Sequence, residues 1–337
     1  MSVPGFWDFD LRCEELKAMR NDLGRLAEAV DFEIFRPLLK NTQERKAETG
    51  RPPYDAVFLF KILVLQSLYN LSDEQTEYQI RDRISFMHFL GLGLSDRVPD
   101  QKTIWLFRDQ LRRADLAQPL FARFEAELKE KGYSAKQGSI MDASIVDVPR
   151  QHNTRKENEQ IARGETPPSF DANPAKRAQK DMDARWVTKN KARHFGYKNH
   201  LSVDVQHKLI RKWNVTDAAT HDSQIVKPLL QHENSSRDVY GDSAYRSAKI
   251  NGTLAELGFR ERIHRKGYRN HPLSKRSKEA NRKKSKIRAR VEHIFGRMER
   301  LTNGTWLRVV GIARATIKIG LRNLVYNLDR YAYLVTA

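Results

Sequence analysis

Apolar positions in the first 131 residues recur every three to four residues, the spacing of one face of an α-helix. Five residues set this spacing at the start of the chain: Leu11, Leu16, Met19, Leu23 and Leu26. The most apolar stretch, from Tyr54 to Tyr69, predicts a helix at the centre of a hydrophobic core. Residues 8–131 are therefore expected to be helical.

Short polar signals predict where these helices begin and end. Asp100 stands where an N-cap residue is expected for a helix from Thr103 to Arg113. A last helix from Leu120 to Lys131 is followed by Gly132, which favours the left-handed conformation that ends many helices. These signals predict an all-helical N-terminal domain over residues 1–132.

Beyond residue 132 the pattern changes to short apolar runs that are typical of β-strands. The run from Gly138 to Val148 is mostly apolar, as expected for a strand buried on both faces. Further strands are expected at His200–Val205, Leu209–Val215, Val239–Asp242 and Arg260–His264, and helices at Ala248–Leu257, Asn281–Arg300 and Ile312–Leu334. This order predicts a mixed α/β, ribonuclease-H-like domain over residues 133–337.

Two stretches depart from this alternation. Residues 150–198 are polar, contain Pro167 and Pro168, and predict a basic loop or mobile arm inserted into the second domain. Residues 260–290 hold 14 Lys or Arg against two Glu, and predict a dense positively charged surface.

Composition narrows the class of protein. The net charge of +19 indicates a polyanionic partner, because Lys and Arg that neutralise phosphates release counterions on binding. Cys13 is the one cysteine, which excludes an intramolecular disulfide and a cysteine-based zinc site. No secretion signal is recognisable, and the apolar run Ala56–Leu65 is short and contains Lys61. We expect a cytoplasmic protein.

Three acidic residues are candidates for a functional role because of the segments in which they lie. Asp142 interrupts the apolar run IMDASIV, and Asp242 ends a short strand in VYGDSAY. A buried carboxylate is costly unless it is hydrogen-bonded, paired or bound to a metal. Singly, each acid has an ordinary alternative: a structural ion pair for Asp142, a helix N-cap for Asp242, and a surface pair with Arg288 for Glu292 on the helix KIRARVEHIFGRMER.

Together the three acids fit one kind of chemistry. In phosphoryl transfer, two metal ions roughly 3.5–4 Å apart stabilise both the attacking and the leaving oxygen. Mg²⁺, or Mn²⁺ in its place, takes oxygen ligands and keeps several waters, so three carboxylates suffice. Two strand acids and one helix acid beside a basic run meet that need. Further acids in range are Asp147, Asp204, Asp217 and Asp222.

The chain contains IMDASIV, HFGYKNHLSVD, VYGDSAYR and IRARVEHIFGRMER in that order. This ordered set resembles the successive motifs of bacterial insertion-sequence transposases of the DDE class, in particular those of the insertion-sequence five family. The segments RPPYDAVFLFKILVLQSLYNLSDEQTEYQIRDRISFMHFLGL and VPDQKTIWLFR resemble that family's helical domain. The resemblance covers the chain from about Arg51 onward.

The resemblance implies a ribonuclease-H-like catalytic domain in which Asp142, Asp242 and Glu292 are metal ligands. Arg288 matches an arginine that the family carries four residues before the glutamate. Two positions depart from the family pattern: Ser285 stands where a tyrosine is expected, and Glu299 where a lysine is expected. An acid at position 299 would repel a DNA strand, so an inactive copy stays an alternative, with Arg297 and Arg300 as substitutes for the lysine.

The expected function is DNA transposition: two-metal cleavage of insertion-sequence ends and joining to target DNA, by a homodimer or larger assembly at the bacterial nucleoid. The alternatives are a catalytically decayed DNA-binding repressor and a metal-dependent nuclease that does not join strands. Candidate DNA contacts are Lys102, Arg108, Trp186, Lys198, Lys283, Lys284, Arg290 and Arg297, with Tyr268 and His271 as stacking residues. The helical domain over residues 1–132 is expected to serve DNA binding or assembly, and its alternative role is packing alone. For Trp186 the alternative role is that of a core anchor.

Overall fold

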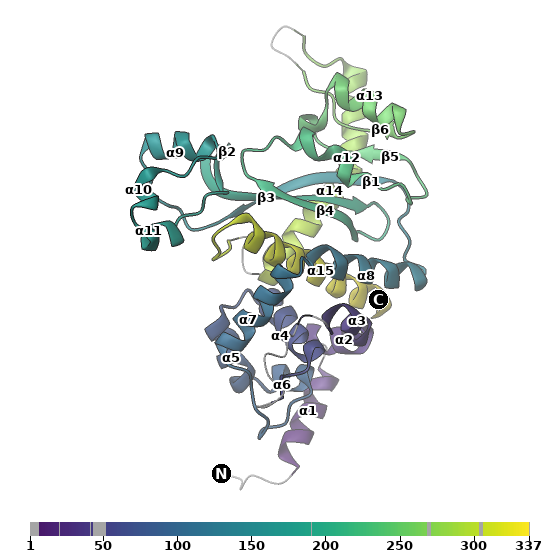
Figure 1. Cartoon of the computed structure of the whole chain (residues 1–337). Helices are drawn as coiled ribbons and strands as arrows, with labels where there is room; N and C mark the ends of the chain where they lie inside the picture. Colours follow the sequence, from purple (N-terminus) through teal and green to yellow (C-terminus); the bar gives the residue numbers. More distant parts are fainter. Residues whose placement is uncertain are drawn as a thin grey trace. The chain divides into compact units, whose positions relative to one another are not determined.

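The computed structural model (Figure 1) describes residues 7–19, 21–40, 42, 52–189, 191–267, 271–302 and 306–336. The chain divides into two compact units. We call the first the helical unit, which comprises Met1–Glu130, Leu301–Asn303 and Gly320–Ala337. The second is the sheet unit, which comprises Lys131–Arg300 and Gly304–Ile319.

The helical unit confirms the expectation of an all-helical N-terminal part. Its elements are α1 (Asp8–Ala18), α2 (Asp22–Ala29), η1 (Phe32–Phe35), α3 (Arg36–Leu39), α4 (Ala56–Leu68), α5 (Asp73–Asp82), α6 (Ile84–Leu90), α7 (Gln101–Arg113) and α8 (Ala117–Glu130). The apolar stretch from Tyr54 to Tyr69 forms α4, in which Phe60, Ile62 and Val64 are fully buried. Burial of apolar side chains on nearly every side of α4 makes it the centre of this core.

The helix ends lie where the polar signals predicted them. Asp100 caps α7 by accepting a hydrogen bond from the backbone N–H of Thr103 at 2.8 Å. Gly132 follows α8 with a φ of +84°, a left-handed conformation that costs glycine little.

Among the described helices, none is by itself both long and apolar enough to cross a membrane. The pair α4 and α5 meets the criterion of length and composition only when the two are taken together, across a bend of 103°.

The sheet unit is built on a six-stranded mixed sheet of β1 (Ser139–Asp147), β2 (Arg185–Lys189), β3 (Ala192–Asp204), β4 (Ile210–Asp217), β5 (Asp238–Tyr240) and β6 (Arg260–Glu261). The order is β2-β3-β1-β5-β6, and β4 also pairs with β3. β1 is antiparallel to β3 and parallel to β5. The predicted central strand and mixed α/β class are thus confirmed.

Helices and turns complete this unit: η2 (Asp222–Ile225), α12 (Val226–Leu229), η3 (Ser243–Tyr245), α13 (Ala248–Glu256), α14 (Lys275–Thr302) and the first part of α15 (Ile312–Thr336). Met141 of β1 packs with Leu229, Tyr245 and Leu254 in one core cluster. Val146 of the same strand packs with Phe195 and Ile319 in another.

The expectation of a loop or mobile arm at residues 150–198 is wrong. The segment forms α9 (Arg155–Ala162), α10 (Pro168–Asp171), α11 (Pro174–Ala178), β2 and the first part of β3. In Figure 1, α9, α10 and α11 gather beside β2 at one end of the sheet. Thr154 and Glu157 form a capping box at the start of α9, and Ile161 and Phe170 supply buried anchors. The segment therefore folds into helices with few apolar residues, because local capping stabilises the helix ends.

Asp181 ties this inserted segment to the rest of the sheet unit. Its buried carboxylate accepts the Tyr197 hydroxyl at 2.8 Å and the backbone N–H groups of Ala184 and Gly311 at 2.9 and 3.0 Å. These partners come from β3, from the start of β2 and from the start of α15. One satisfied carboxylate thus joins three segments that lie far apart in the sequence.

The division of the chain also differs from the expected one at the C-terminus. Residues 133–337 were expected to form a single catalytic domain, but α15 enters the helical unit at Gly320. In that unit Tyr331 packs edge-on against Phe124 of α8, with ring centroids 5.9 Å apart. Gly304, between the helices expected at Asn281–Arg300 and Ile312–Leu334, lies outside the described residues.

Candidate active site

Asp142 lies in the middle of β1, the strand that pairs with both β3 and β5. Its side chain is 17% exposed. Burial raises the pKa of Asp142 to about 6, whereas the positive charge of Arg288 and the hydrogen bond from the backbone N–H of Ala143, at 2.9 Å, oppose that rise. A carboxylate placed here is costly in the free protein, which is typical of a functional group.

Asp242 follows β5 directly and lies beside Asp142. β1 and β5 are parallel with Ile140 opposite Tyr240, so each aspartate comes two residues after a paired position. The charge of Asp242 contributes to the raised pKa of Asp142. Asp242 also caps η3, because its Oδ1 accepts a hydrogen bond from the backbone N–H of Ala244 at 2.8 Å. The capping role and the position beside Asp142 therefore coexist.

α14 presents Arg288 to this pair. The Arg288 Nη2 atom lies 3.7 Å from Asp142 Oδ2, and its side chain is 25% exposed. Glu292, one turn further along α14, is exposed. Within the described ranges no three Asp, Glu, His or Cys side chains form a group that could hold a metal ion. The structure thus brings together two of the three predicted ligands, and Glu292 as the third stays a prediction.

Three residues around the acidic pair were not singled out from the sequence as site residues. Tyr245 is buried, and its hydroxyl has no hydrogen-bond partner among the described residues. Burial and the charges of Asp222, Asp142 and Asp242 raise the pKa of Tyr245. His264 donates its backbone N–H to Gly241, next to Asp242, and the Lys189 charge lowers the pKa of Asp142. The sequence carries no signal for His264 as a neighbour of the pair, because its position depends on long-range pairing.

A second polar group lies on β3 and on the turn after β4. The Lys198 ammonium donates to Asp222 Oδ1 at 2.9 Å and to the backbone carbonyl of Thr220 at 2.7 Å. The fully buried His200 ring contacts Thr216 Oγ1 through Nε2 at 2.9 Å, and its Nδ1 lies 3.9 Å from Asp222 Oδ1. Lys198 therefore fixes Asp222 at the edge of the site and is engaged within the protein.

This group predicts a pH dependence of stability. Burial lowers the pKa of His200 from 6.5 to about 4, although Asp222 and Asp217 oppose the shift and Lys198 reinforces it. Below pH 6.5 the unfolded chain takes up a proton that the folded chain refuses, so the contribution of His200 to the free energy of unfolding should fall as the pH drops from 6.5 toward 4. Urea denaturation at a series of pH values measures this. The His200→Gln variant should show a shallower fall over the same interval, and an unchanged slope would contradict the assignment.

Several candidate DNA contacts are engaged inside the protein. Arg108 pairs with Asp73, with its Nη2 2.8 Å from Oδ2, and also donates to Gln66, so it stabilises the helical unit. Lys284 donates to the carbonyl of Ile263 at 2.8 Å, and Arg290 to that of Val205 at 2.7 Å. These contacts leave the three side chains poorly placed for DNA.

Other candidates lie at the surface. Lys102 and His271 are exposed, and the exposed Lys283 pairs with Glu279 one turn away. Arg297 is partly buried. Trp186 packs on Phe195 with ring centroids 5.1 Å apart, which matches its alternative role as a core anchor. Tyr268 lies outside the described residues.

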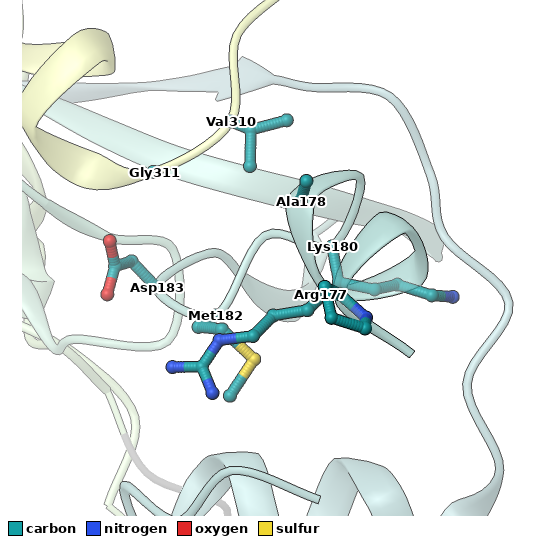
Figure 2. A pocket seen from close by; sticks show the side chains of 8 residues that line it. Arg177, Ala178, Lys180, Met182, Asp183, Val310 and Gly311 are labelled. Atoms are coloured by element: carbon teal, nitrogen blue, oxygen red, sulfur yellow. The ribbon is translucent and has the colours of Figure 1, made fainter. Parts of the chain in front are cut away.

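A surface hollow of about 410 Å³ lies between α11 and the start of α15 (Figure 2), and neither Asp142 nor Asp242 lines it. The cations that line it are already engaged: Arg177 pairs with Asp171, and Lys180 donates to the carbonyl of His152 and to Asn153 Oδ1, both at 2.8 Å. Because these two cations have partners within the protein, the hollow does not form an anion site.

Comparison with known families adds to this geometry. A family model described as a transposase DDE domain matches residues 133–328, more than half of the chain. The chain belongs to the DDE transposase family. A second model, described as a transposase domain (DUF772), matches residues 11–110 of this transposase. The two models together confirm the expected class of insertion-sequence transposase, and the transposase is a DDE-type enzyme.

Two solved structures align with the transposase over nearly its whole length. A piggyBac transposase synaptic complex with hairpin DNA has 12% identity and a TM-score of 0.43, with 98% of this chain and 76% of that chain covered. A pre-cleavage Mos1 transpososome has 12% identity and a TM-score of 0.21, with 99% of this chain and 98% of that chain covered. The family models, and not these alignments, decide the identification.

The two departures from the family motif lie on α14 of the transposase. Ser285 Oγ contacts His264 Nε2 at 3.3 Å. Glu299 is exposed at the other end of the motif. Both departures thus lie on α14, whereas Asp142 and Asp242 come from β1 and from the end of β5.

Proposed function

We propose that this transposase cuts the ends of its own insertion sequence and joins them to target DNA at a site built around Asp142 and Asp242. The observation that supports this is the placement of Asp142 on β1 and of Asp242 just past the end of the adjacent parallel strand β5, with Arg288 3.7 Å from Asp142. The strand order of the mixed sheet supports a ribonuclease-H-like catalytic fold for the sheet unit.

The residues present fit a divalent cation. Burial and the neighbouring Asp242 charge raise the pKa of Asp142, as expected where the free protein does not fully compensate these negative charges. The ligand atoms of Asp142, Asp242 and Glu292 are all carboxylate oxygens, the type of ligand that Mg²⁺ and Mn²⁺ bind. Asp142 and Asp242 would hold the metal, with Glu292 as the third ligand. A pair of bound ions would activate the attacking oxygen and stabilise the leaving one.

Within the protein, each residue has a separate task. Asp142 and Asp242 provide a negative site where β1 and the end of β5 lie side by side within the sheet. Arg288 partly neutralises Asp142 in the free protein and is placed to contact a DNA phosphate once the carboxylates have another cationic partner. The exposed cations of α14 attract the DNA backbone without reading its sequence.

Joining needs two element ends in one complex, so we propose that the transposase acts as a dimer or larger assembly on DNA in the bacterial nucleoid. Double-stranded DNA with the terminal repeats and the target DNA are the two partners. The net charge of +19 supports a polyanionic partner of this kind.

The test is a cleavage and joining assay on DNA that carries the element's own ends, with Mg²⁺, Mn²⁺ or EDTA. Metal-dependent cleavage and joined products are expected for the wild type, and Glu292→Gln should lose both by about 10³-fold if it completes the metal site. Glu279→Gln, an exposed glutamate near the start of the same helix, is the matched control. Cleavage without joining would favour a nuclease, and binding without cleavage under any metal would favour a regulatory DNA-binding protein.

A further inference from the structure

The segment of residues 306–310, which precedes α15, lies along the end of β1. The backbone N–H of Leu307 donates to the carbonyl of Asp147, the last residue of β1, at 2.8 Å. That carbonyl points away from β3, because the next residue, Val148, directs its N–H to Phe195 of β3 and successive residues of a strand point to opposite edges. The segment therefore lies on the edge of β1 that pairs with β5 further back along the strand.

One side chain of this segment enters the core, and its two neighbours lie at the surface. Leu307 is 2% exposed and packs with Val146 and Ile319 in the core cluster at this end of the sheet. Trp306 is 42% exposed, and Arg308 is also exposed. The Arg308 guanidinium carbon lies 5.2 Å from the centre of the Trp306 ring. Anchoring at Leu307 thus presents a tryptophan and an arginine together at the surface.

Packing within the protein does not explain the exposed ring of Trp306. Leu307 already supplies the apolar contact that holds the segment in place. Trp186, by comparison, is partly buried and packs on Phe195, as a core anchor does. A large exposed aromatic side chain calls for an explanation. An aromatic ring beside an arginine is typical of surfaces that stack nucleobases, because every base has a π-face and every nucleotide carries a phosphate.

The charges around this pair of side chains favour a polyanion. The sequence contains no acidic residue from Leu301 to Leu328. Two acids from other segments lie beside residues 306–312, and the carboxylates of both are engaged. Asp147 contacts the His194 ring at 3.0 Å between Oδ2 and Nδ1, and Asp183 accepts the backbone N–H of Ile312 at 2.8 Å. An approaching phosphate therefore meets no uncompensated carboxylate from these two neighbours.

β1 links this surface to the acidic pair. Asp147, beside which Leu307 is anchored, comes five residues after Asp142 on the same strand. At about 3.3 Å per residue, five residues of a strand span about 17 Å. Along one strand of a duplex each nucleotide advances about 3.4 Å, so the same span corresponds to about five nucleotides. A single bound DNA strand is therefore long enough to occupy both places.

We propose that Trp306 and Arg308 bind one unpaired nucleotide of the DNA strand that occupies the acidic site, about five nucleotides from the phosphate that is cut. The indole ring stacks on the base, and the guanidinium contacts a phosphate beside it. The base is unpaired because, inside a duplex, neighbouring base pairs cover both of its faces. This inference rests on the proposed function, which supplies DNA as the substrate of the site.

Photocross-linking tests the stacking contact without depending on catalysis. Element-end duplexes would carry one unpaired 5-iodouracil, moved through successive positions on each side of the cut. After irradiation in EDTA, peptide mapping should place the adduct on Trp306 when the base lies about five nucleotides from the cut. Trp105→Ala removes a tryptophan of similar exposure, 43%, from the helical unit and should leave this adduct unchanged. Absence of an adduct on Trp306 at every position would overturn the proposal.

Affinity for two matched duplexes gives an independent measurement in EDTA. Trp306→Ala should weaken binding to the duplex with the unpaired base by about 5- to 150-fold, and binding to the fully paired duplex much less. Trp306→Phe keeps an aromatic ring and should retain most of the preference, which separates stacking from a folding defect. Arg308→Gln should reduce the slope of log affinity against log salt by about 0.9, since one phosphate contact is lost.

The outcomes separate this site from the proposed function. Equal losses for Trp306→Ala on the two duplexes, with cleavage by the wild type retained, contradict the nucleotide site alone. A wild type that prefers the unpaired duplex through Trp306, but never cleaves with Mg²⁺ or Mn²⁺, contradicts the proposed function and leaves the nucleotide site intact.

Discussion

Asp142→Asn should abolish strand cleavage, with a loss of at least about 10³-fold, while DNA binding stays nearly unchanged. Asparagine keeps the shape of aspartate but removes the charge that a divalent cation needs. Asp242→Asn should show the same loss, because both carboxylates belong to one pair on adjacent strands. Cleavage by either variant above a hundredth of the wild-type rate would contradict the assignment.

Asp142→Asn should leave the free energy of unfolding unchanged or increase it. In the folded protein the pKa of Asp142 is raised from 3.8 to about 6, so above pH 6 the ionised carboxylate weakens folding relative to a neutral group. Asparagine removes that cost and gives up only the 3.7 Å contact with Arg288. Thermal unfolding at pH 8 measures the effect, and Glu256→Gln on the exposed face of α13 is a suitable control. A large fall in Tm would show a structural role for the carboxylate instead.

Asp204→Ala should cost the sheet unit about 3–5 kcal/mol, the largest loss of stability that we expect from a single carboxylate. Asp204 is fully buried at the end of β3. Its carboxylate accepts the backbone N–H groups of His207 and Leu209 at 2.6 and 3.2 Å, and Arg211 Nε at 2.9 Å. Arg211, also buried, donates on to the carbonyl of Tyr133 at 2.7 Å. Alanine would remove the carboxylate partner of a buried guanidinium and the acceptor of two turn N–H groups.

Controls can separate the charge from the hydrogen bonds in this group. Asp204→Asn keeps an acceptor for the turn and should lose less than alanine does. The double variant Asp204→Ala/Arg211→Met removes the uncompensated cation and should recover part of the loss. Hydrogen exchange in β3 and β4 reports on the sheet unit directly, since the two units need not unfold together. A loss below about 0.5 kcal/mol for Asp204→Ala would place it among ordinary surface substitutions.

Local patterns predicted much of this fold because they act over a few residues. The apolar run of α4 and the cap at Asp100 depend on near neighbours, and the structure confirms both. β1 was predicted from its continuous apolar run, since a strand between two others is buried on both faces. The positions of Asp142 and Asp242 at strands were predicted from these runs, whereas their adjacency depends on the parallel pairing of β1 and β5, which the sequence alone did not predict.

Properties set by distant partners were not predictable in this way. The inserted segment was predicted to be a loop because its residues are mostly polar, but it forms three helices. These helices depend on Asp181 and on the buried side chains of Ile161 and Phe170. The sequence shows Arg108 as a free cation on a helix, but Asp73, 35 residues earlier, engages it. The length of β3 depends on β2, which arrives from the inserted segment. In each case the contact that determines the structure joins residues far apart in the sequence. No periodic pattern of residues indicates that such a pair will meet.

The return of α15 to the helical unit has a consequence for how the chain is made. Residues from Gly320 onward belong with helices that end at Glu130, so the ribosome must synthesise the whole sheet unit before the helical unit is complete. Until then, Phe124 lacks Tyr331, and Asn70 lacks the Arg322 guanidinium that donates to it at 2.8 Å. A chain that stops early would expose part of that core and become a target for proteolysis. Truncated copies of the gene should therefore leave little protein that competes with the intact transposase for DNA ends.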